Sequence, residues 1–220
     1  MIFPILLGLV GCTILIALGV WQVQRLAWKE AVLARIEARI HDAPVALPAV
    51  PDEARDKYLP VRVTGVFTGQ EIFMLQGMKD TSPGVEVIAA FETTDHRRIL
   101  VDRGFLPDQA RGSPRPAGVP VVLTGNLHWP HEADSYTPPP DARSGLWFAR
   151  DVTAMARALN TEPTMIVANG PAVDGIAPMP IDTSSIPNNH RNYAITWFSL
   201  AAVWAGMTLF LLWRIRQRRV

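Results

Sequence analysis

Two apolar stretches without charged residues stand at the ends of the chain, and a mixed polar region lies between them. Residues 1–24 contain no Asp, Glu, Lys or Arg, and residues 192–213 contain none either. Each stretch is long enough for a helix that crosses a hydrocarbon core, which needs about 20 residues. The pattern predicts a membrane protein with a first transmembrane helix over 1–24 and a second over 192–213.

The first apolar stretch continues into a segment with helical spacing. Val32, Leu33, Ile36 and Ile40 recur at intervals of three and four residues, which is typical of one helix face. A cleaved signal peptide is the alternative, but such peptides carry a positively charged region first, and no charged residue precedes Ile2. We therefore expect an uncleaved anchor, followed by a helical extension and linker over 25–57.

The middle of the chain alternates between apolar and polar residues, as strands with one buried face do. We expect a turn at Gly69 between the first two strands and a hairpin around 94–96 between the next two. The strand-like segments are 58–69, 71–77, 84–95, 97–107, 119–129 and 164–170.

One short helix is predicted within this region. In "RDVTAMARALN", Asp151 is a favourable N-cap, and Val152, Met155 and Leu159 have the spacing of an inward face. The fold class is therefore α+β: an exported, mainly antiparallel β domain with a short helix over 58–170, which could close partly into a barrel. A linker over 171–191 leads to the second apolar stretch.

Charge sets the expected orientation. Four arginines follow Trp213 within the tail 214–220, and positive residues beside a membrane helix stay in the cytoplasm. Both termini are then cytoplasmic and the middle domain is periplasmic. Because an Arg-rich and Ser-rich presequence is missing, we expect a bacterial inner (cell) membrane. A formal net charge of +1 does not favour nucleic acid as a partner.

Several catalytic signatures are missing from the sequence. It contains no Gly-rich phosphate loop followed by Lys-Ser or Lys-Thr, no HExxH, no CxxC and no GxSxG. The single cysteine, Cys12, lies in the first apolar stretch, so the middle domain has no thiolate site. The adjacent charges of Asp102-Arg103 and Arg150-Asp151 face opposite sides of an extended chain, and we expect them to pair with other strands or to cap the helix. These observations favour a protein that is not an enzyme.

The predicted outer ends of the two membrane helices carry the most informative side chains. Trp and Tyr favour the membrane interface and Arg can extend to it, so an aromatic belt explains most of them. An aromatic belt explains His190 poorly. Neutral imidazole is a common metal ligand, and haem iron takes an axial histidine. The candidate cofactor-binding residues are His190 as the axial ligand, Tyr193, Trp197 and Trp21 as apolar walls, and Arg25 as a cation for the propionates.

Five segments resemble, in order, the successive motifs of the Surfeit locus protein family, whose members assist assembly of haem-copper cytochrome oxidase. The most specific are "LGVWQVQRLAWKEAVL" at 18–33 and "NNHRNYAITWFSLA" at 188–201. The chain departs from the family pattern at Asp102, often Asn, and at Ala149, an aromatic in the family. The other matching segments are 58–67, 99–107 and 150–163.

The resemblance implies a function. It implies haem a as a transient cargo, cytochrome c oxidase subunit I as the recipient, His190 as the axial ligand, and contact with membrane lipid. Haem a synthase is a further partner that it allows. The alternative is a membrane scaffold for the oxidase or for haem synthase that does not itself bind haem. A hydrolase in the exported domain would need a nucleophile and base at recognisable spacing, and the sequence offers none.

Overall fold

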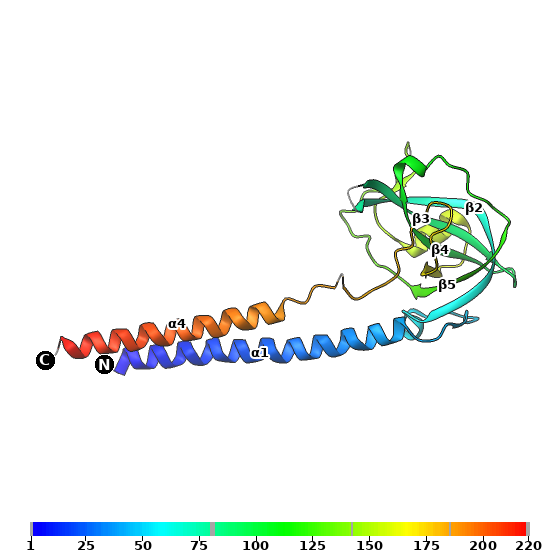
Figure 1. Cartoon of the computed structure of the whole chain (residues 1–220). Helices are drawn as coiled ribbons and strands as arrows, with labels where there is room; N and C mark the ends of the chain where they lie inside the picture. Colours follow the sequence, from blue (N-terminus) through cyan, green and yellow to red (C-terminus); the bar gives the residue numbers. More distant parts are fainter. Residues whose placement is uncertain (1, 80–81, 142, 185, 219–220) are drawn as a thin grey trace. The chain divides into compact units, whose positions relative to one another are not determined.

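The chain forms two compact units in a computed structural model that describes residues 2–79, 82–141, 143–184 and 186–218. The helix unit contains both chain ends, Met1–Ile36 and Thr183–Val220. The barrel unit contains Glu37–Asp182, which is wider at both ends than the range 58–170 defined from the sequence. Figure 1 shows the long helices and the strands of the two units.

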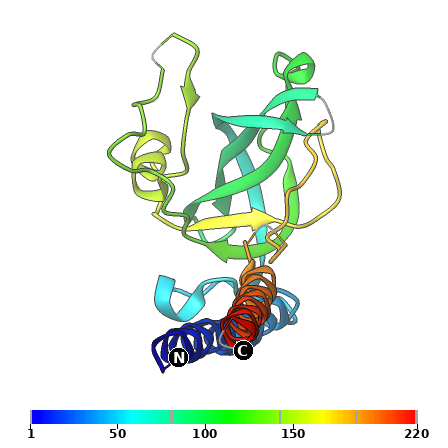
Figure 2. The same cartoon turned by 90° about the vertical axis from the view of Figure 1, so that its left-hand side faces the viewer.

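The helix unit consists of two long antiparallel helices that lie side by side (Figures 1 and 2). Helix α1 (Ile2–Ile40) is continuous, and α4 (His190–Gln217) begins at the histidine and includes Arg214 and Arg216 in its last turns. Both helices are long and apolar enough to cross a membrane. Most of their large apolar side chains are exposed, which is consistent with a membrane protein.

Small residues let the two helices approach closely. A side chain added at Gly11 would lie 2.3 Å from the Trp204 ring, and one added at Gly19 would lie 2.7 Å from the Phe198 ring. The Cys12 thiol lies 3.9 Å from the Ala201 carbonyl oxygen. Close approach at small residues is the usual way in which helices associate in lipid, where dispersion contacts replace the hydrophobic effect.

The barrel unit is built on a closed ring of five strands. In ring order these are β2 (Pro60–Lys79), β3 (Ser82–Thr93), β4 (Arg98–Pro107), β7 (Met165–Ala168) and β5 (Pro120–His128), and β5 pairs back with β2. Two short strands, β1 (Val45–Ala46) and β6 (Leu146–Trp147), pair with β2. The remaining elements are α2 (Glu53–Asp56), the 3-10 turn η1 (Asp108–Ala110) and α3 (Val152–Leu159). Figure 2 shows the strands curving around the barrel.

The sheet is mixed. Antiparallel pairs join β2 to β3, β3 to β4, β2 to β5, and β5 to β7, as the sequence predicted for most of the domain. Three parallel pairs were not expected: β4 with β7, β1 with β2, and β2 with β6. A parallel neighbour requires a long crossover, and the chain from β4 to β7 supplies one by way of β5 and α3.

The predicted turn at Gly69 is wrong, because β2 runs through this position without a break. Gly69 has φ +83°, and the register with β3 shifts between Phe67 and Glu71. Such a bulge bends a strand and is favoured by glycine, which reaches positive φ without a Cβ clash. Strand β2 pairs with β5 from Pro60 to Val66, and it pairs with β3 from Gly65 onwards. The bulge therefore allows one long strand to close the barrel.

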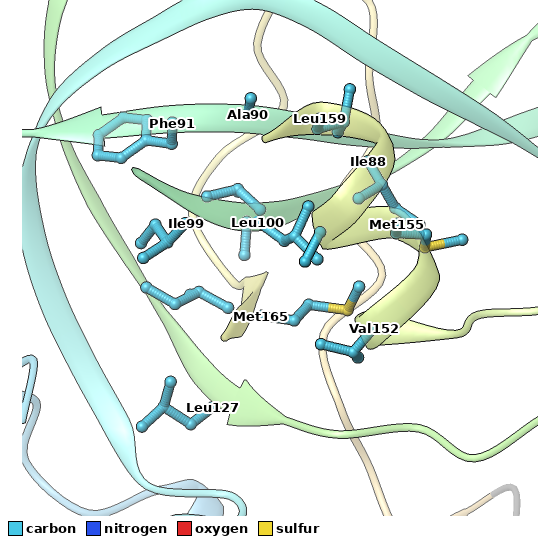
Figure 3. Close-up of a cluster of buried hydrophobic side chains, with 14 of the residues drawn as sticks. Ile88, Ala90, Phe91, Ile99, Leu100, Leu127, Val152, Met155, Leu159 and Met165 are labelled. Atoms are coloured by element: carbon cyan, nitrogen blue, oxygen red, sulfur yellow. The ribbon is translucent and has the colours of Figure 1, made fainter. Parts of the chain in front are cut away.

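The predicted hairpin and helix are confirmed. Strands β3 and β4 are joined at 94–97, with His96 at φ +60° in the turn. Asp151 caps α3 by accepting a hydrogen bond from the Ala154 amide at 3.0 Å. The inward residues Val152, Met155 and Leu159 are buried against the sheet, near Leu100 and Met165 (Figure 3). Their spacing places one face of α3 on the barrel core.

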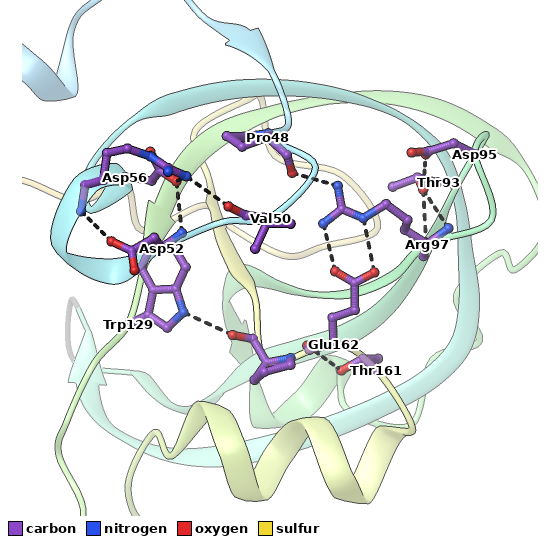
Figure 4. A network of polar contacts seen from close by, with 12 residues as sticks. Pro48, Val50, Asp52, Asp56, Thr93, Asp95, Arg97, Trp129, Thr161 and Glu162 are labelled. Atoms are coloured by element: carbon purple, nitrogen blue, oxygen red, sulfur yellow. Dashed lines mark hydrogen bonds and ion pairs between the residues drawn. The ribbon is translucent and has the colours of Figure 1, made fainter.

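Polar contacts tie the segments outside the strands to the barrel. The Arg97 guanidinium binds the Glu162 carboxylate at 2.7 and 3.1 Å and donates to the Pro48 carbonyl at 2.8 Å (Figure 4). Trp129 donates to the Pro163 carbonyl at 3.0 Å in the same network. On the C-terminal side, the Ala177 amide donates to the Phe105 carbonyl at 2.8 Å. These bonds make the neighbouring proline-rich segments part of the barrel unit.

Candidate functional site

The candidate site lies where the contact line between α1 and α4 reaches His190. On α1 a residue covered by the other helix recurs every three or four positions. On α4 the covered residues begin at His190 and recur at the same spacing. We call this line the helix seam. Its covered positions include Gly8, Gly11, Leu15, Leu18, Gly19 and Gln22 on α1, and His190, Ala194, Trp197, Ala201, Ala205 and Thr208 on α4.

A polar pair occupies one end of the helix seam. The Gln22 side chain is 8% exposed, and its Oε1 lies 2.7 Å from Nδ1 of His190. A buried amide oxygen without a hydrogen-bond partner destabilises the folded protein by about 1–3 kcal/mol. The contact with His190 avoids this cost for Oε1 of Gln22. Oε1 can only accept, so this contact requires a proton on Nδ1, and Nε2 is the ring nitrogen that takes no part in it. No hydrogen bond to Nε2 is present among the described residues.

The aromatic and basic candidates lie beside this pair on the surface of the helix unit. Trp21 is 53% exposed and Tyr193 is 55% exposed, so neither is enclosed in a pocket between the helices. Trp197 is half-buried on the helix seam, one heptad deeper than His190. The Arg25 guanidinium stacks over the Trp28 ring at 4.0 Å, and within the described residues it forms no salt bridge.

Helix geometry places three of these side chains on one face. Successive helical residues are rotated by about 100° around the axis. Trp21 and Arg25 are therefore rotated backwards from Gln22, by about 100° and about 60°. Tyr193, three residues after His190, is rotated backwards by about 60° as well. Because α1 and α4 are antiparallel, the same sense of rotation brings all three side chains onto the same face of the pair.

Gln22 is the residue that sequence reasoning did not assign to the site. The sequence has two amide side chains at the end of the first apolar stretch, Gln22 and Gln24, and no sequence motif distinguishes one from the other. Only the packing distinguishes them, since Gln24 is exposed and Gln22 is covered by α4. The spacing of Gln22 from Leu15 and Leu18, seven and four residues earlier, is the available signal.

The apolar groove of the helix unit lies at its other end. This groove has a volume of about 390 Å³, and its walls include Phe3, Gly8, Trp204 and Phe210. It therefore has no part in the surroundings of His190. The site at His190 is instead an open surface with one imidazole, exposed aromatic rings and one arginine.

The barrel unit holds a second group of ionisable side chains, centred on Arg150. Its guanidinium donates to Glu86 at 3.0 Å and to Asp102 at 3.4 Å, and it also binds Glu132. Arg103 binds Glu71 at 3.3 Å and Asp174 at 2.6 Å. The prediction that these adjacent charges pair with other strands is confirmed.

Burial shifts the titration of this group. Desolvation and the neighbouring Asp102 raise the pKa of Glu86 to about 9, so this carboxyl is protonated at neutral pH. Burial also lowers the pKa of His128 to about 4, and its Nδ1 is buried without a hydrogen-bond partner. Both residues lie on strands of the barrel unit, Glu86 on β3 and His128 on β5. Among the described residues, no three His, Cys, Asp or Glu side chains are grouped as a metal site.

Comparison with known proteins identifies the family. The model of the SURF1 family matches residues 9–202. The human protein named Surfeit locus protein 1 is 33% identical over 208 aligned positions, covering 84% of this chain and 68% of the human one. A SURF1-like protein of Rickettsia felis is 29% identical over 231 aligned positions, covering 98% of this chain and 97% of its own. The match takes in the barrel, Gln22 and His190, and the chain belongs to the SURF1 family.

Proposed function

We propose that this protein is a non-catalytic assembly factor for haem-copper cytochrome c oxidase that binds haem a and assists its delivery to subunit I. The observation that carries the proposal is the His190 imidazole, whose Nδ1 is held by Gln22 at 2.7 Å while Nε2 takes no part in that contact. A neutral imidazole with its proton on Nδ1 can ligate iron through Nε2.

The proposal includes insertion in a bacterial inner membrane. The exposed apolar surface of both helices would be unfavourable in water and is satisfied in lipid. The spans are then 1–24 and 192–213, and Arg214 and Arg216 keep the chain ends on the cytoplasmic side. In this arrangement the barrel unit is periplasmic and His190 lies near the outer membrane surface.

The residues around His190 fit a porphyrin better than a bare metal ion. One imidazole holds a bare ion weakly, whereas haem a brings four pyrrole nitrogens and needs one axial ligand from the protein. The exposed rings of Trp21 and Tyr193 offer apolar surface on the same face. The Arg25 guanidinium, free of carboxylate partners in the described residues, can bind a propionate.

A carrier must also release its cargo. A single protein ligand suits release, because only one bond between iron and protein has to break. No other histidine occurs within residues 1–40 or 191–220, so the helices offer only His190 for a bond of this type. We therefore infer ligation of the iron from one side, because His190 is the only histidine of the two helices.

The proposal is tested by the optical spectrum of the protein purified in detergent after co-expression with enzymes of haem a synthesis. We expect a haem a spectrum in the wild type and its loss in His190→Ala. The matched control is His41→Ala, an exposed histidine of the barrel unit, which should keep the spectrum. Absence of haem from the wild type, with oxidase assembly still dependent on the protein, would contradict the proposal and favour the membrane scaffold.

A further inference from the structure

Gln22, the buried side chain opposite His190, differs from the other polar side chains of α1. Other polar side chains in the apolar part of α1 are satisfied within their helix or exposed: Thr13 donates to the Leu9 carbonyl at 2.9 Å, and Gln24 is exposed. Gln22 is buried and bonds across to α4. Burial of a polar group is costly unless it is hydrogen-bonded, and polar side chains inside membrane helices commonly mark functional positions.

We infer that Gln22 is a positioning residue that fixes the tautomer and ring orientation of His190 for iron ligation. The inference rests on the proposed function and extends it to a side chain of the other helix. With Oε1 as acceptor, the proton of the neutral ring is held on Nδ1. Nε2 is thereby left unprotonated, as an axial ligand requires.

The hydrogen bond also tunes the ligand. An acceptor at Nδ1–H draws the proton away from the ring and makes Nε2 more basic, which strengthens its bond to a metal. Loss of such a partner typically lowers metal affinity about 10- to 100-fold. A stronger acceptor, such as a carboxylate, shifts electron density further towards the iron and favours its ferric state.

A purely structural role for Gln22 makes different predictions. Hydrogen bonds between membrane helices contribute on average about 0.6 kcal/mol, so the Gln22–His190 bond could serve only to join α1 to α4. In that situation, a change at Gln22 would loosen the helix pair. It would not move the proton between the ring nitrogens in one direction or shift the reduction potential according to the acceptor introduced.

The first experiment needs no haem. Nitrogen NMR of the protein labelled at histidine reports whether the His190 proton lies on Nδ1 or Nε2. We expect the Nδ1–H form in the wild type and a shift in Gln22→Leu towards the Nε2–H form, which the neutral histidine side chain prefers in water. Gln24→Leu is the matched control, because it removes an exposed amide two residues away and should leave the tautomer unchanged.

The second experiment uses the haem a complex. We expect Gln22→Leu to bind haem a about 10- to 100-fold more weakly and to raise the reduction potential of the haem that remains. Gln22→Glu should retain haem and lower the potential, because the carboxylate is the stronger acceptor. Shifts of opposite sign cannot arise from misfolding, which would weaken binding in both variants.

The outcomes separate the two ideas. Equal tautomers and equal potentials in wild type, Gln22→Leu and Gln22→Glu would overturn the positioning role while leaving His190 as the ligand. A wild-type protein that takes up no haem a would overturn the proposed function and the positioning role together. A tautomer change in Gln22→Leu combined with potential shifts of opposite sign supports both.

Discussion

The barrel unit and the helix unit use polar side chains in opposite ways. In the barrel unit, buried charges form a connected group in which Arg150 alone contacts Glu86, Asp102 and Glu132. In the helix unit, the described contacts include a single side-chain hydrogen bond between α1 and α4 side chains, from His190 to Gln22. In the barrel unit the buried polar side chains therefore connect several strands and loops, whereas in the helix unit the polar contact joins only one residue of each helix.

This contrast predicts that changes in the two units have separable effects. A barrel substitution should alter the unfolding of the barrel and leave the state of His190 unchanged. A helix-seam substitution should do the reverse. The chain divides into these two compact units at Ile36 and Asp182.

The largest effect on stability is expected from Arg150→Met. Removing the guanidinium leaves the buried carboxylate of Asp102 without its cation and the buried carboxyl of Glu86 without its hydrogen-bond donor, and breaking a buried pair in this way typically costs about 3 kcal/mol or more. Chemical denaturation of the detergent-purified protein, followed by tryptophan fluorescence, measures the loss. Arg143→Met, at an exposed position, should change stability little. An equally stable Arg150→Met protein would show that the cluster does not hold the barrel.

A smaller effect, confined to the helix unit, is expected from Gly11→Leu. The new side chain would enter the space of the Trp204 ring, which a Cβ at this position already approaches to 2.3 Å, and overpacking typically costs about 1–3 kcal/mol. We expect the barrel to unfold at the same denaturant concentration as in the wild type. The Nδ1–H form of His190 should be lost as the helix seam separates.

The matched control for this seam variant is Val10→Leu, on the exposed side of the same helix. It should keep both the barrel stability and the tautomer of His190. If Gly11→Leu retained the wild-type tautomer, the helix seam would not be what holds His190 against Gln22.

The most gradual effect is the pH dependence of barrel stability. The pKa of Glu86 is raised to about 9 in the folded state from an ordinary value near 4.5, so the folded protein binds the proton more tightly than the unfolded chain. This contribution is fully present below about pH 4.5 and is lost as the pH rises towards 9. The slope for one proton is at most about 1.4 kcal/mol per pH unit.

His128 acts in the opposite direction at lower pH. Its pKa is lowered from 6.5 to about 4, so its contribution is present above pH 6.5 and is lost as the pH falls towards 4. Below pH 6.5 the two residues change the free energy of unfolding with pH in opposite directions, and their effects offset each other. Between pH 6.5 and 9 the effect of Glu86 dominates the pH dependence of stability. Denaturation at pH 6.5 and 8.5 should show lower stability at the higher pH in the wild type and a smaller difference in Glu86→Gln. A wild type that is equally stable at both values would contradict the raised pKa.

Elements defined by short-range pattern could be predicted from the sequence. The periodicity of Val152, Met155 and Leu159 and the N-cap Asp151 were enough for α3, and the apolar stretches were enough for the two long helices. The pattern failed at Gly69, because a glycine between two strand-like segments is equally compatible with a turn and with a bulge. The choice depended on whether β2 had partners on both sides of that residue, and it had.

What the sequence alone determined is the two long helices, α3, most strand segments of the barrel and the position of His190 at the start of an apolar helix, since helix caps, spacing and hydropathy act over a few residues. Only the tertiary structure decided which side chains meet. Closure of the barrel by β5 and β2, the clustering of Glu86 and Asp102 on Arg150, and the pairing of Gln22 with His190 all join distant parts of the chain. Such contacts depend on packing and desolvation of both partners together, and no local pattern records them.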